Sequence, residues 1–438
     1  MRLGVWTAPL ILLATLWPGT AWAQLAGRYG PAGNIDLTGI SSAIRDIQLL
    51  PGDGSTGVRL GSLVARPEAG ATAGFDDNVL GTRKARGSAF VATQAVLQAG
   101  SDRLRNNISA RMTVDDLHYL DQPRQSHTEW TARLDASYEI GRDTATLRYE
   151  HQNLNQTPRD LNVPQLDVPI AYRVDDVQLA YEKRFNRLAL RPSLDVTALS
   201  YDDGSVAGQP YRQGYRDRTT LTPAMLATYE LAPQRYLVGV VGNGIAAFRR
   251  PLPGASLLDY NDVFTLGGID YDGGGLFRVR ALAGYEARSF SNPSLKSIQA
   301  PVAELTLIYR LTKLTMVTTV VTRRIADSAD ETTTGVTKTG AVLTVDHEYL
   351  RNVLLKATGG LSLAQYGRSQ GEQTLITAGA GATWLVNHKI RLTAAYDLQA
   401  RQSHLNALLG GATQPGAGQP TGGSFNSNRY SLQLSIRL

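Results

Sequence analysis

The last nine residues, 430–438, alternate between apolar and polar side chains without interruption. The apolar set comprises Tyr430, Leu432, Leu434, Ile436 and Leu438. Because successive side chains of a β-strand point to opposite faces, this segment predicts a strand with one apolar and one polar face. Such a strand suits the wall of a transmembrane β-barrel, in which one face meets lipid and the other meets water.

The N-terminus has the features of a secretory signal peptide. Arg2 supplies a positive charge, residues 5–16 are mostly apolar, and Ala21 and Ala23 form a small-residue cleavage motif. We expect residues 1–23 to be removed, and the loss of Arg2 lowers the formal net charge from +6 to +5. The alternative is a retained membrane anchor, but the apolar stretch is shorter than the ~20 residues that a spanning helix needs.

The composition of the remaining chain narrows the possible classes of protein. After the signal peptide, no apolar run in the sequence is long enough for a membrane-spanning helix. The chain has no cysteine, so disulfides do not stabilise it, although a secreted chain could form them. The charged residues are scattered, and no basic cluster suggests a nucleic-acid partner. A soluble β-protein and a membrane β-barrel remain.

Periodicity separates these two classes. From residue 62 onward the chain divides into alternating runs, of which 130–140, 145–150, 177–182 and 390–399 are the clearest. Runs of roughly 10–15 residues are typical of membrane barrels, whereas strands of soluble sheets usually have about 5–6 residues. A soluble sandwich or propeller would also need a partner sheet to cover each apolar face. The pattern therefore favours an all-β, antiparallel, up-and-down transmembrane barrel.

The connections between these runs give the strand number. Short turns are predicted at 100–102, 141–143, 186–187, 232–235, 273–275, 312–313, 351–352 and 387–388. Longer loops are predicted near 76–86, 120–126, 155–169, 202–215, 250–260, 291–296, 326–332, 367–372 and 402–425. Since long and short connections alternate, the chain predicts about 18 strands with both termini on the periplasmic side. The run 260–271 is the weakest, because Gly267 and Gly268 interrupt it; without its hairpin the number would be 16.

The barrel is predicted to comprise residues 62–438. We expect its last strand, 430–438, to pair with the first, 62–75, so that no strand edge stays open in the membrane. Residues 24–61 do not alternate and include one candidate short helix at 40–49. This segment is interpreted as a periplasmic tail, with a short plug inside the pore as the alternative.

An 18-stranded barrel encloses a wide lumen. Strands ~4.8 Å apart and tilted by ~40° form a cylinder on the order of 35 Å across. The predicted pore-lining residues are Arg111, Arg133, Arg148, Glu150, Arg184, Arg191, Arg278, Arg280, Arg288, Arg310, Arg391, Asp397 and Arg437. Their excess of arginine indicates a path for neutral or anionic polar solutes. The alternative is that arginines and carboxylates of neighbouring strands pair and only keep the wall polar.

Tyrosine recurs near the predicted strand ends, among them Tyr119, Tyr138, Tyr366 and Tyr430. A phenol ring prefers the boundary between lipid and water, because the ring is apolar and the hydroxyl is polar. The tyrosines are therefore predicted to form girdles on the outer face.

Catalytic and metal sites are weakly indicated. His118 and His127 flank one predicted loop and His151 lies near the next, but none has the neighbouring nucleophile and orienting group of a catalytic site. The acidic segments 76–78 and 202–204 could supply oxygen ligands to Ca²⁺. Turn formation explains their Asp, Asn and Gly equally well and is the preferred interpretation. We therefore predict no enzyme, no cofactor and no metal.

The segment 65–79, which ends in Gly-Phe-Asp-Asp-Asn-Val, resembles the putative beta-barrel porin 2 family of outer-membrane proteins, as do segments 142–151 and 201–203. The resemblance covers about residues 60–438. It implies an outer-membrane location and, because members of that family often accompany exopolysaccharide production and export loci, a role in passing a polymer across the outer membrane. The chain departs from the usual C-terminal Phe or Trp of such barrels by ending in Leu438. This difference bears on recognition by the barrel insertion machinery.

The sequence thus predicts a porin-like channel for polar solutes, with saccharide or exopolysaccharide export as the specific hypothesis. The alternative is a plugged structural or surface-attachment barrel that acts through its outer loops. The expected partners are outer-membrane lipid, the insertion machinery and polysaccharide export components.

Overall fold

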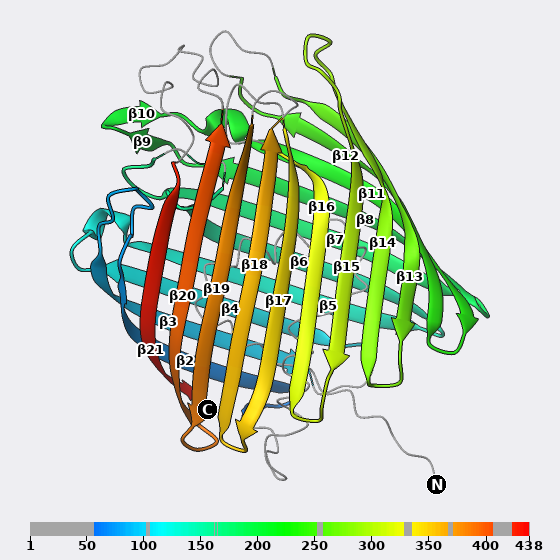
Figure 1. Ribbon diagram of the computed structural model, residues 1–438. Helices are drawn as coiled ribbons and strands as arrows, with labels where there is room; N and C mark the ends of the chain where they lie inside the picture. Colours follow the sequence, from blue (N-terminus) through cyan, green and yellow to red (C-terminus); the bar gives the residue numbers. More distant parts are fainter. Residues whose placement is uncertain are drawn as a thin grey trace.

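The computed structural model describes residues 57–101, 106–161, 163, 165–251, 257–327, 335–366, 371–405 and 423–437. The described residues form a closed antiparallel ring of 18 long strands (Figure 1). The strands of the ring are β2 (Leu63–Asp76), β3 (Ser88–Ser101), β4 (Ile108–Tyr119), β5 (His127–Ile140), β6 (Asp143–Gln156), β7 (Ile170–Arg184), β8 (Leu188–Tyr201), β11 (Arg218–Ala232), β12 (Arg235–Phe248), β13 (Tyr260–Asp272), β14 (Phe277–Phe290), β15 (Ile298–Arg310), β16 (Thr315–Ala326), β17 (Val336–Leu350), β18 (Val353–Tyr366), β19 (Gly371–Leu385), β20 (Ile390–Leu405) and β21 (Phe425–Arg437).

The remaining elements are short. The strand β1 (Val58–Leu60) folds back onto the start of β2. The strands β9 (Gly204–Val206) and β10 (Gln209–Tyr211) form a small separate hairpin, and η1 (Pro123–Gln125) and η2 (Gly214–Arg216) are single 3-10 turns. No helix of sufficient length and apolar character to span a bilayer occurs in the part of the chain that the structure describes.

The two ends of the barrel wall join directly. Residues Glu68 to Asp76 of β2 pair with Arg429 to Arg437 of β21, which closes the ring as the sequence predicted. The run that contains Gly267 and Gly268 is the strand β13, so the strand number is 18 and not 16. The predicted signal peptide (1–23), the candidate helix (40–49) and Leu438 lie outside the described residues.

The connections divide the barrel into two unlike ends. At one end, here named the short-turn end, turns such as 141–142 join β5 to β6, and β2 begins and β21 ends there. At the other, the long-loop end, connections such as 157–169 join β6 to β7. In Figure 1 the short-turn end lies at the bottom. The alternation of connections therefore matches the prediction, while the assignment of the short-turn end to the periplasm stays a prediction.

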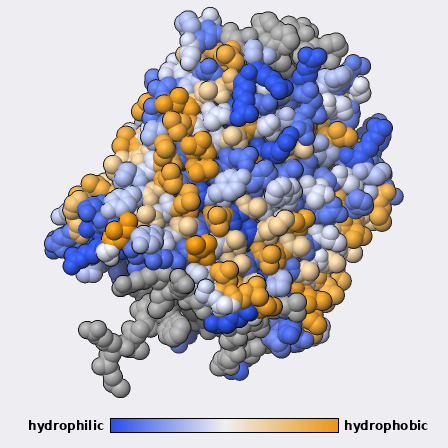
Figure 2. All heavy atoms as spheres, turned by 180° about the vertical axis from the view of Figure 1, so that it is seen from behind, coloured by the Kyte–Doolittle hydropathy of each residue, from blue (hydrophilic) through white to orange (hydrophobic). Residues whose placement is uncertain are grey.

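Strand register assigns each side chain to one of two faces. On β21, Tyr430 and Leu432 are 56% and 52% exposed, and their cross-strand neighbours are small or apolar. Figure 2 shows groups of such apolar side chains over the outer wall. Asp76 and Arg429, which pair across the closure, lie on the opposite, inner face. The alternation read from the sequence thus separates a lipid-facing surface from an inner one.

The tyrosines divide between the two faces. Tyr138 and Tyr430 are exposed on the outer wall, as expected of an interfacial girdle. Tyr119 and Tyr366 are only 4% and 1% exposed and lie on the inner face, so their placement in an outer girdle was wrong. Their hydroxyls instead bond to Asp76 and Gln373, respectively.

The inner face of β11–β14 is less polar than the sequence predicted. An apolar cluster lies there, formed by Leu226, Val238, Val240, Phe264 and Leu282. The sequence did not reveal this cluster, because the outward positions of the same strands are apolar too, and alternation disappears when both faces are apolar.

Glycines let the strands of this region approach closely. A Cβ atom added to Gly268 would lie 1.8 Å from the carbonyl oxygen of Ala281, and one added to Gly284 would lie 1.8 Å from that of Thr265. Only glycine fits at such close backbone contacts. The glycines that weakened the strand prediction for 260–271 are therefore part of how β13 packs in the ring.

We expect Leu432→Arg, which places a charge on the lipid-facing side of β21, to destabilise the barrel by about 2–4 kcal/mol, the range for a bilayer midplane. Gln433→Arg is the matched control, because Gln433 lies one residue on and faces inward. The control should change stability by less than about 1 kcal/mol. Urea unfolding in lipid vesicles measures both values, and equal losses would contradict the assignment of the two faces.

Candidate functional site

The inner wall carries the charged residues that the sequence singled out. Arg111 pairs with Arg133, and Arg133 pairs with Glu150 on the next strand, so these three side chains share one face. Continued around the ring, the register places all the predicted pore-lining residues on the inner face, opposite the exposed apolar side chains. Their role in conduction stays a prediction.

Part of this charge is neutralised within the wall. Asp135 lies between two guanidiniums, with Arg133 Nε at 2.7 Å and Arg148 Nε at 2.9 Å from its carboxylate oxygens. Arg278 forms a longer pair with Asp270 at 3.4 Å. The pairs of Arg148 and Arg278 join neighbouring strands, as in the alternative that the sequence left open, whereas Arg133 pairs within its own strand.

The connection between β6 and β7, residues 157–169 and here named the crossing loop, reaches the opposite side of the ring. Leu161 packs against Val336, Ala364 and Tyr366, which belong to β17 and β18. In either direction around the ring, those two strands lie at least eight positions from β6 and β7. Because the ring is closed, a contact of this kind has to pass across the interior of the barrel.

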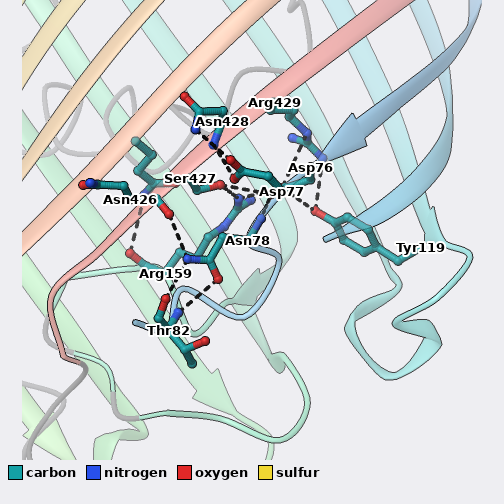
Figure 3. Close-up of polar contacts among 11 residues, drawn as sticks. Asp76, Asp77, Asn78, Thr82, Tyr119, Arg159, Asn426, Ser427, Asn428 and Arg429 are labelled. Atoms are coloured by element: carbon teal, nitrogen blue, oxygen red, sulfur yellow. Dashed lines mark hydrogen bonds and ion pairs between the residues drawn. The ribbon is translucent and has the colours of Figure 1, made fainter. Parts of the chain in front are cut away.

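Arg159 fastens the crossing loop to the seam where the chain's first and last long strands meet (Figure 3). Its Nη1 atom donates to Asp76 Oδ2 at 2.7 Å and to Ser427 Oγ at 3.2 Å. Asp76 is fully buried, and it also accepts hydrogen bonds from the hydroxyls of Tyr119 and Ser427. Arg429 completes the group, with Nε 4.0 Å from the same carboxylate. We call these five residues the latch.

A second arginine holds the backbone of the crossing loop. Arg401 of β20 donates through Nη1 to the carbonyl oxygens of Pro158 at 3.1 Å and Asp160 at 2.7 Å. Farther along, Gln165 donates to the carbonyl oxygen of Leu80 in the connection between β2 and β3. The described residues of the loop are thus hydrogen-bonded to the rest of the barrel at residues 158–160 and again at Gln165.

Two charged groups of the crossing loop have shifted pKa values. Burial lowers the pKa of Arg159, but the neighbouring Asp76 carboxylate and Tyr119 outweigh it and hold that pKa above its usual range. Burial raises the pKa of the Asp160 carboxyl above its ordinary value, while the N–H of Thr157 and the Arg159 guanidinium offset part of the effect.

A separate ionic cluster lies at the long-loop end between β11, β14 and the loop after β16. Asp327 contacts the guanidinium of Arg218 and lies 2.6 Å from Nη1 of Arg288. Arg288, which is 1% exposed, also forms a 2.8 Å pair with Asp262. Burial makes such pairs sensitive to the loss of either partner, because the remaining charge is left without compensation.

In the candidate calcium segments, carboxylates accept hydrogen bonds from backbone N–H groups. The Asp76 carboxylate accepts from the N–H of Asn78 at 3.0 Å, and Asp203 accepts from the N–H of Gln213 at 2.8 Å. Asp202 pairs with Arg173 at 3.1 Å. Within the described residues, no group of three or more His, Cys, Asp or Glu side chains could hold a metal ion. The turn interpretation therefore fits both segments.

The histidines are not gathered into one site. His127 pairs with Leu117, and both side chains face inward. His118 follows Leu117 on the same strand and therefore faces outward. The ring of His127 contacts the carbonyl oxygen of Gln125 at 2.8 Å. His151 faces outward and lies 2.7 Å from Asp175.

The sequence did not indicate the crossing loop as a site. Arg159 and Asp160 stand in a polar connection that looks like the other loops, and their partners lie on distant strands. The one available signal was a proline next to two charged residues in a long loop, which also describes many ordinary turns.

Comparisons with known proteins agree with this architecture. A family model described as putative beta-barrel porin 2 matches residues 51–408, and the chain therefore belongs to that family. It is a porin-like protein of the bacterial outer membrane, and its family and fold are those of a channel and not of an enzyme.

Solved outer-membrane proteins are similar at low identity. The outer membrane protein OpdK of Pseudomonas aeruginosa has 10% identity and a TM-score of 0.43, over 85% of this chain and 98% of that chain. A BenF-like porin of Pseudomonas fluorescens Pf-5 has 10% identity and a TM-score of 0.45, over 86% of this chain and all of that chain (100%). OccAB2 of Acinetobacter baumannii has 10% identity and a TM-score of 0.43, with coverages of 86% and 100%. A comparison with curated protein sequences gives no match.

We expect Arg159→Met to release the crossing loop, because it leaves the Asp76 carboxylate buried without its closest cation. The latched arrangement should lose about 3–5 kcal/mol, the usual effect of removing one partner of a buried pair. Limited proteolysis of residues 157–169 in the folded barrel measures the release. Adding Asp76→Asn to Arg159→Met should cost much less than the two single changes together, and strictly additive losses would contradict direct coupling.

The attachment of the crossing loop should depend on pH through Asp160. Since the folded pKa of Asp160 is raised above its ordinary value of 3.8, the latched loop is most stable below that value and loses stability as pH rises through the raised pKa. Hydrogen-exchange protection of residues 157–161, corrected for intrinsic rates, should therefore fall as the pH rises above the ordinary carboxyl pKa of about 4. Asp160→Asn should remove this dependence. A persistent dependence in that variant would assign it to another group.

Proposed function

We propose that this outer-membrane barrel conducts neutral and anionic polar solutes, with saccharides as the solute class. The observation that carries the proposal is the inner wall, on which the register places guanidiniums from many strands of one closed ring. A lumen rich in fixed positive charge raises the local concentration of anions. Guanidinium and carboxylate groups also offer the dense donors and acceptors that sugar hydroxyls require.

The proposed orientation places the short-turn end in the periplasm. Barrels of this class have short periplasmic turns and longer extracellular loops. The crossing loop and the latch then lie at the outer mouth, where they limit the size of the solute that passes. In this arrangement residues 24–61 form a periplasmic tail. Polysaccharide export components deliver the solute from the periplasmic side. The insertion machinery acts on the strand that ends near Leu438.

A second candidate function is a plugged structural barrel that acts through its outer loops. The observation that favours it is the crossing loop, which spans the interior and is fixed by Arg159 and Arg401. The two functions differ in whether the lumen conducts ions while the latch is intact.

Conductance in planar bilayers separates the two candidates. We expect stepwise, anion-preferring currents from the purified protein. Replacing Arg111, Arg148 and Arg191 by Gln should lower the anion-to-cation permeability ratio several-fold, because fewer guanidiniums then offset Asp135 and the other inner carboxylates. Arg173→Gln is the control, since Arg173 faces outward, and it should leave the ratio unchanged. A folded barrel that carries no current would favour the plugged alternative.

The saccharide class is tested separately from conductance. Vesicles that contain the barrel should swell when charged or neutral oligosaccharides are added, at rates that fall with oligosaccharide size. In the producing cell, loss of the gene should trap polysaccharide in the periplasm. Unchanged secretion together with normal ion conductance would reject the polymer while leaving the channel intact.

A further inference from the structure

The wall of the barrel is not hydrogen-bonded along its full height between β15 and β16. Among the described residues, the ladder between them stops at the pair Ala303 and Arg323, although β15 starts at Ile298 and β16 continues to Ala326. By contrast, β16 pairs with β17 all the way to Ala326 and Val336. Figure 1 shows β15 and β16 diverging towards the long-loop end.

The bond missing from the ladder can be identified from the register. The N–H of Arg310 in β15 donates to the carbonyl oxygen of Leu276, which precedes β14, and the N–H of Glu348 in β17 donates to that of Leu314, which precedes β16. The backbone groups of even-numbered residues therefore bond to β14 from β15 and to β17 from β16. The backbone groups of odd-numbered residues point from β15 and β16 towards each other. Continued by one step, the register would place Pro301 opposite Ile325.

Side chains replace that bond on both strands. The N–H of Ile325 donates to Glu286 Oε2 of β14 at 3.2 Å. The carbonyl oxygen of Pro301 accepts from Arg323 Nε at 3.2 Å. Each backbone group that would have met in the ladder is thus satisfied separately, as a low-dielectric environment requires.

Proline weakens the ladder here but does not explain its end. Pro301 has no N–H and cannot return a bond to Ile325. Pro192 and Pro223 also lie within long strands and interrupt pairing locally, yet the ladder resumes beyond each of them. A further force must keep the end of β16 away from β15.

That force comes from the ionic cluster at the long-loop end. Asp327 directly follows β16 and is held by Arg288 at 2.6 Å and by Arg218 on the inner face. By its position in the alternation of β16, Ile325 belongs to the lipid-facing set of side chains, yet it is only 1% exposed. The end of β16 is therefore drawn inward, so that a residue patterned for lipid is covered by protein.

We propose that the end of β16 is a gate with two arrangements, an inference that rests on the channel function proposed above. In the observed arrangement, residues 324–327 are tucked inward and narrow the mouth. In the other, residues 324–326 pair with 300–302 of β15, Ile325 faces lipid, and Asp327 moves away from Arg288 and Arg218. In both arrangements the N–H of Ile325 and the carbonyl oxygen of Pro301 have partners, from side chains in the first and from each other in the second. A change in the ion pairs of Asp327 is therefore enough to shift the balance.

Cross-linking can detect the second arrangement directly, because the chain has no native cysteine. Val302→Cys with Arg324→Cys places two thiols at positions that face each other only when the ladder extends, within the ~7 Å Cα separation that a disulfide allows. Glu304→Cys with Thr322→Cys is the matched control, since these residues are already an inward-facing pair of the same type. The control should oxidise fully and the test pair slowly.

Asp327→Asn should increase the oxidation rate of the test pair by at least roughly fivefold and leave the control pair unchanged. Pro301→Thr, which restores the missing N–H, should increase it by an independent route and serves if Asp327→Asn fails to fold. Folding of each variant is checked by heat-dependent migration on gels. A test pair that stays reduced in both backgrounds while the control oxidises would overturn the gate, as would an equal rate with and without Asp327.

Single-channel recording distinguishes this inference from the proposed function. Oxidation of the test pair should increase the time spent in the higher-conductance state, and a reductant should reverse it. If Asp327→Asn speeds oxidation of the test pair but no variant carries current, the strand rearrangement is supported and the channel is rejected. Normal current that ignores oxidation of the test pair would keep the channel and reject the gate.

Discussion

The whole structure depends on the pairing of β2 with β21. Inside a bilayer, every backbone N–H and C=O group needs a partner within the protein, and an open sheet would leave two rows of them exposed to lipid. The bonds between residues 68–76 and 429–437 remove both edges. Once the ring is closed, alternation acquires a fixed meaning: one parity faces lipid and the other faces the lumen. The inner charges, the crossing loop and the latch all take their positions from this closure.

The order of the strands was predictable because its signals are local. Alternation over 430–438 and the turn residues near 141–143 depend on neighbours in the chain, and they gave both the strand number and the closing pair. The apolar cluster around Phe264 was not predictable, because both faces of β12 are apolar and the period of two carries no contrast there.

The latch was out of reach for a different reason. Asp76 begins a turn-like sequence, and nothing near it in the chain shows that its carboxylate binds Arg159, 83 residues away. The same applies to Pro301, which reads as an ordinary strand interruption until the position of Asp327 is known. Sequence patterns predict which face a residue occupies, whereas contacts across the lumen depend on how the closed ring brings distant loops together.

The latch also has a consequence for the order of assembly. Arg159 binds Asp76 and Ser427, which are 83 and 268 residues away along the chain and become neighbours only when the first and last long strands join. Contacts of such long sequence separation form late, because the entropy of closing the intervening chain has to be overcome first. We therefore expect the crossing loop to take its place across the mouth late in folding. A barrel in which β2 and β21 have not yet paired cannot form the latch. The buried Arg159–Asp76 pair is therefore present only in a molecule whose wall is complete.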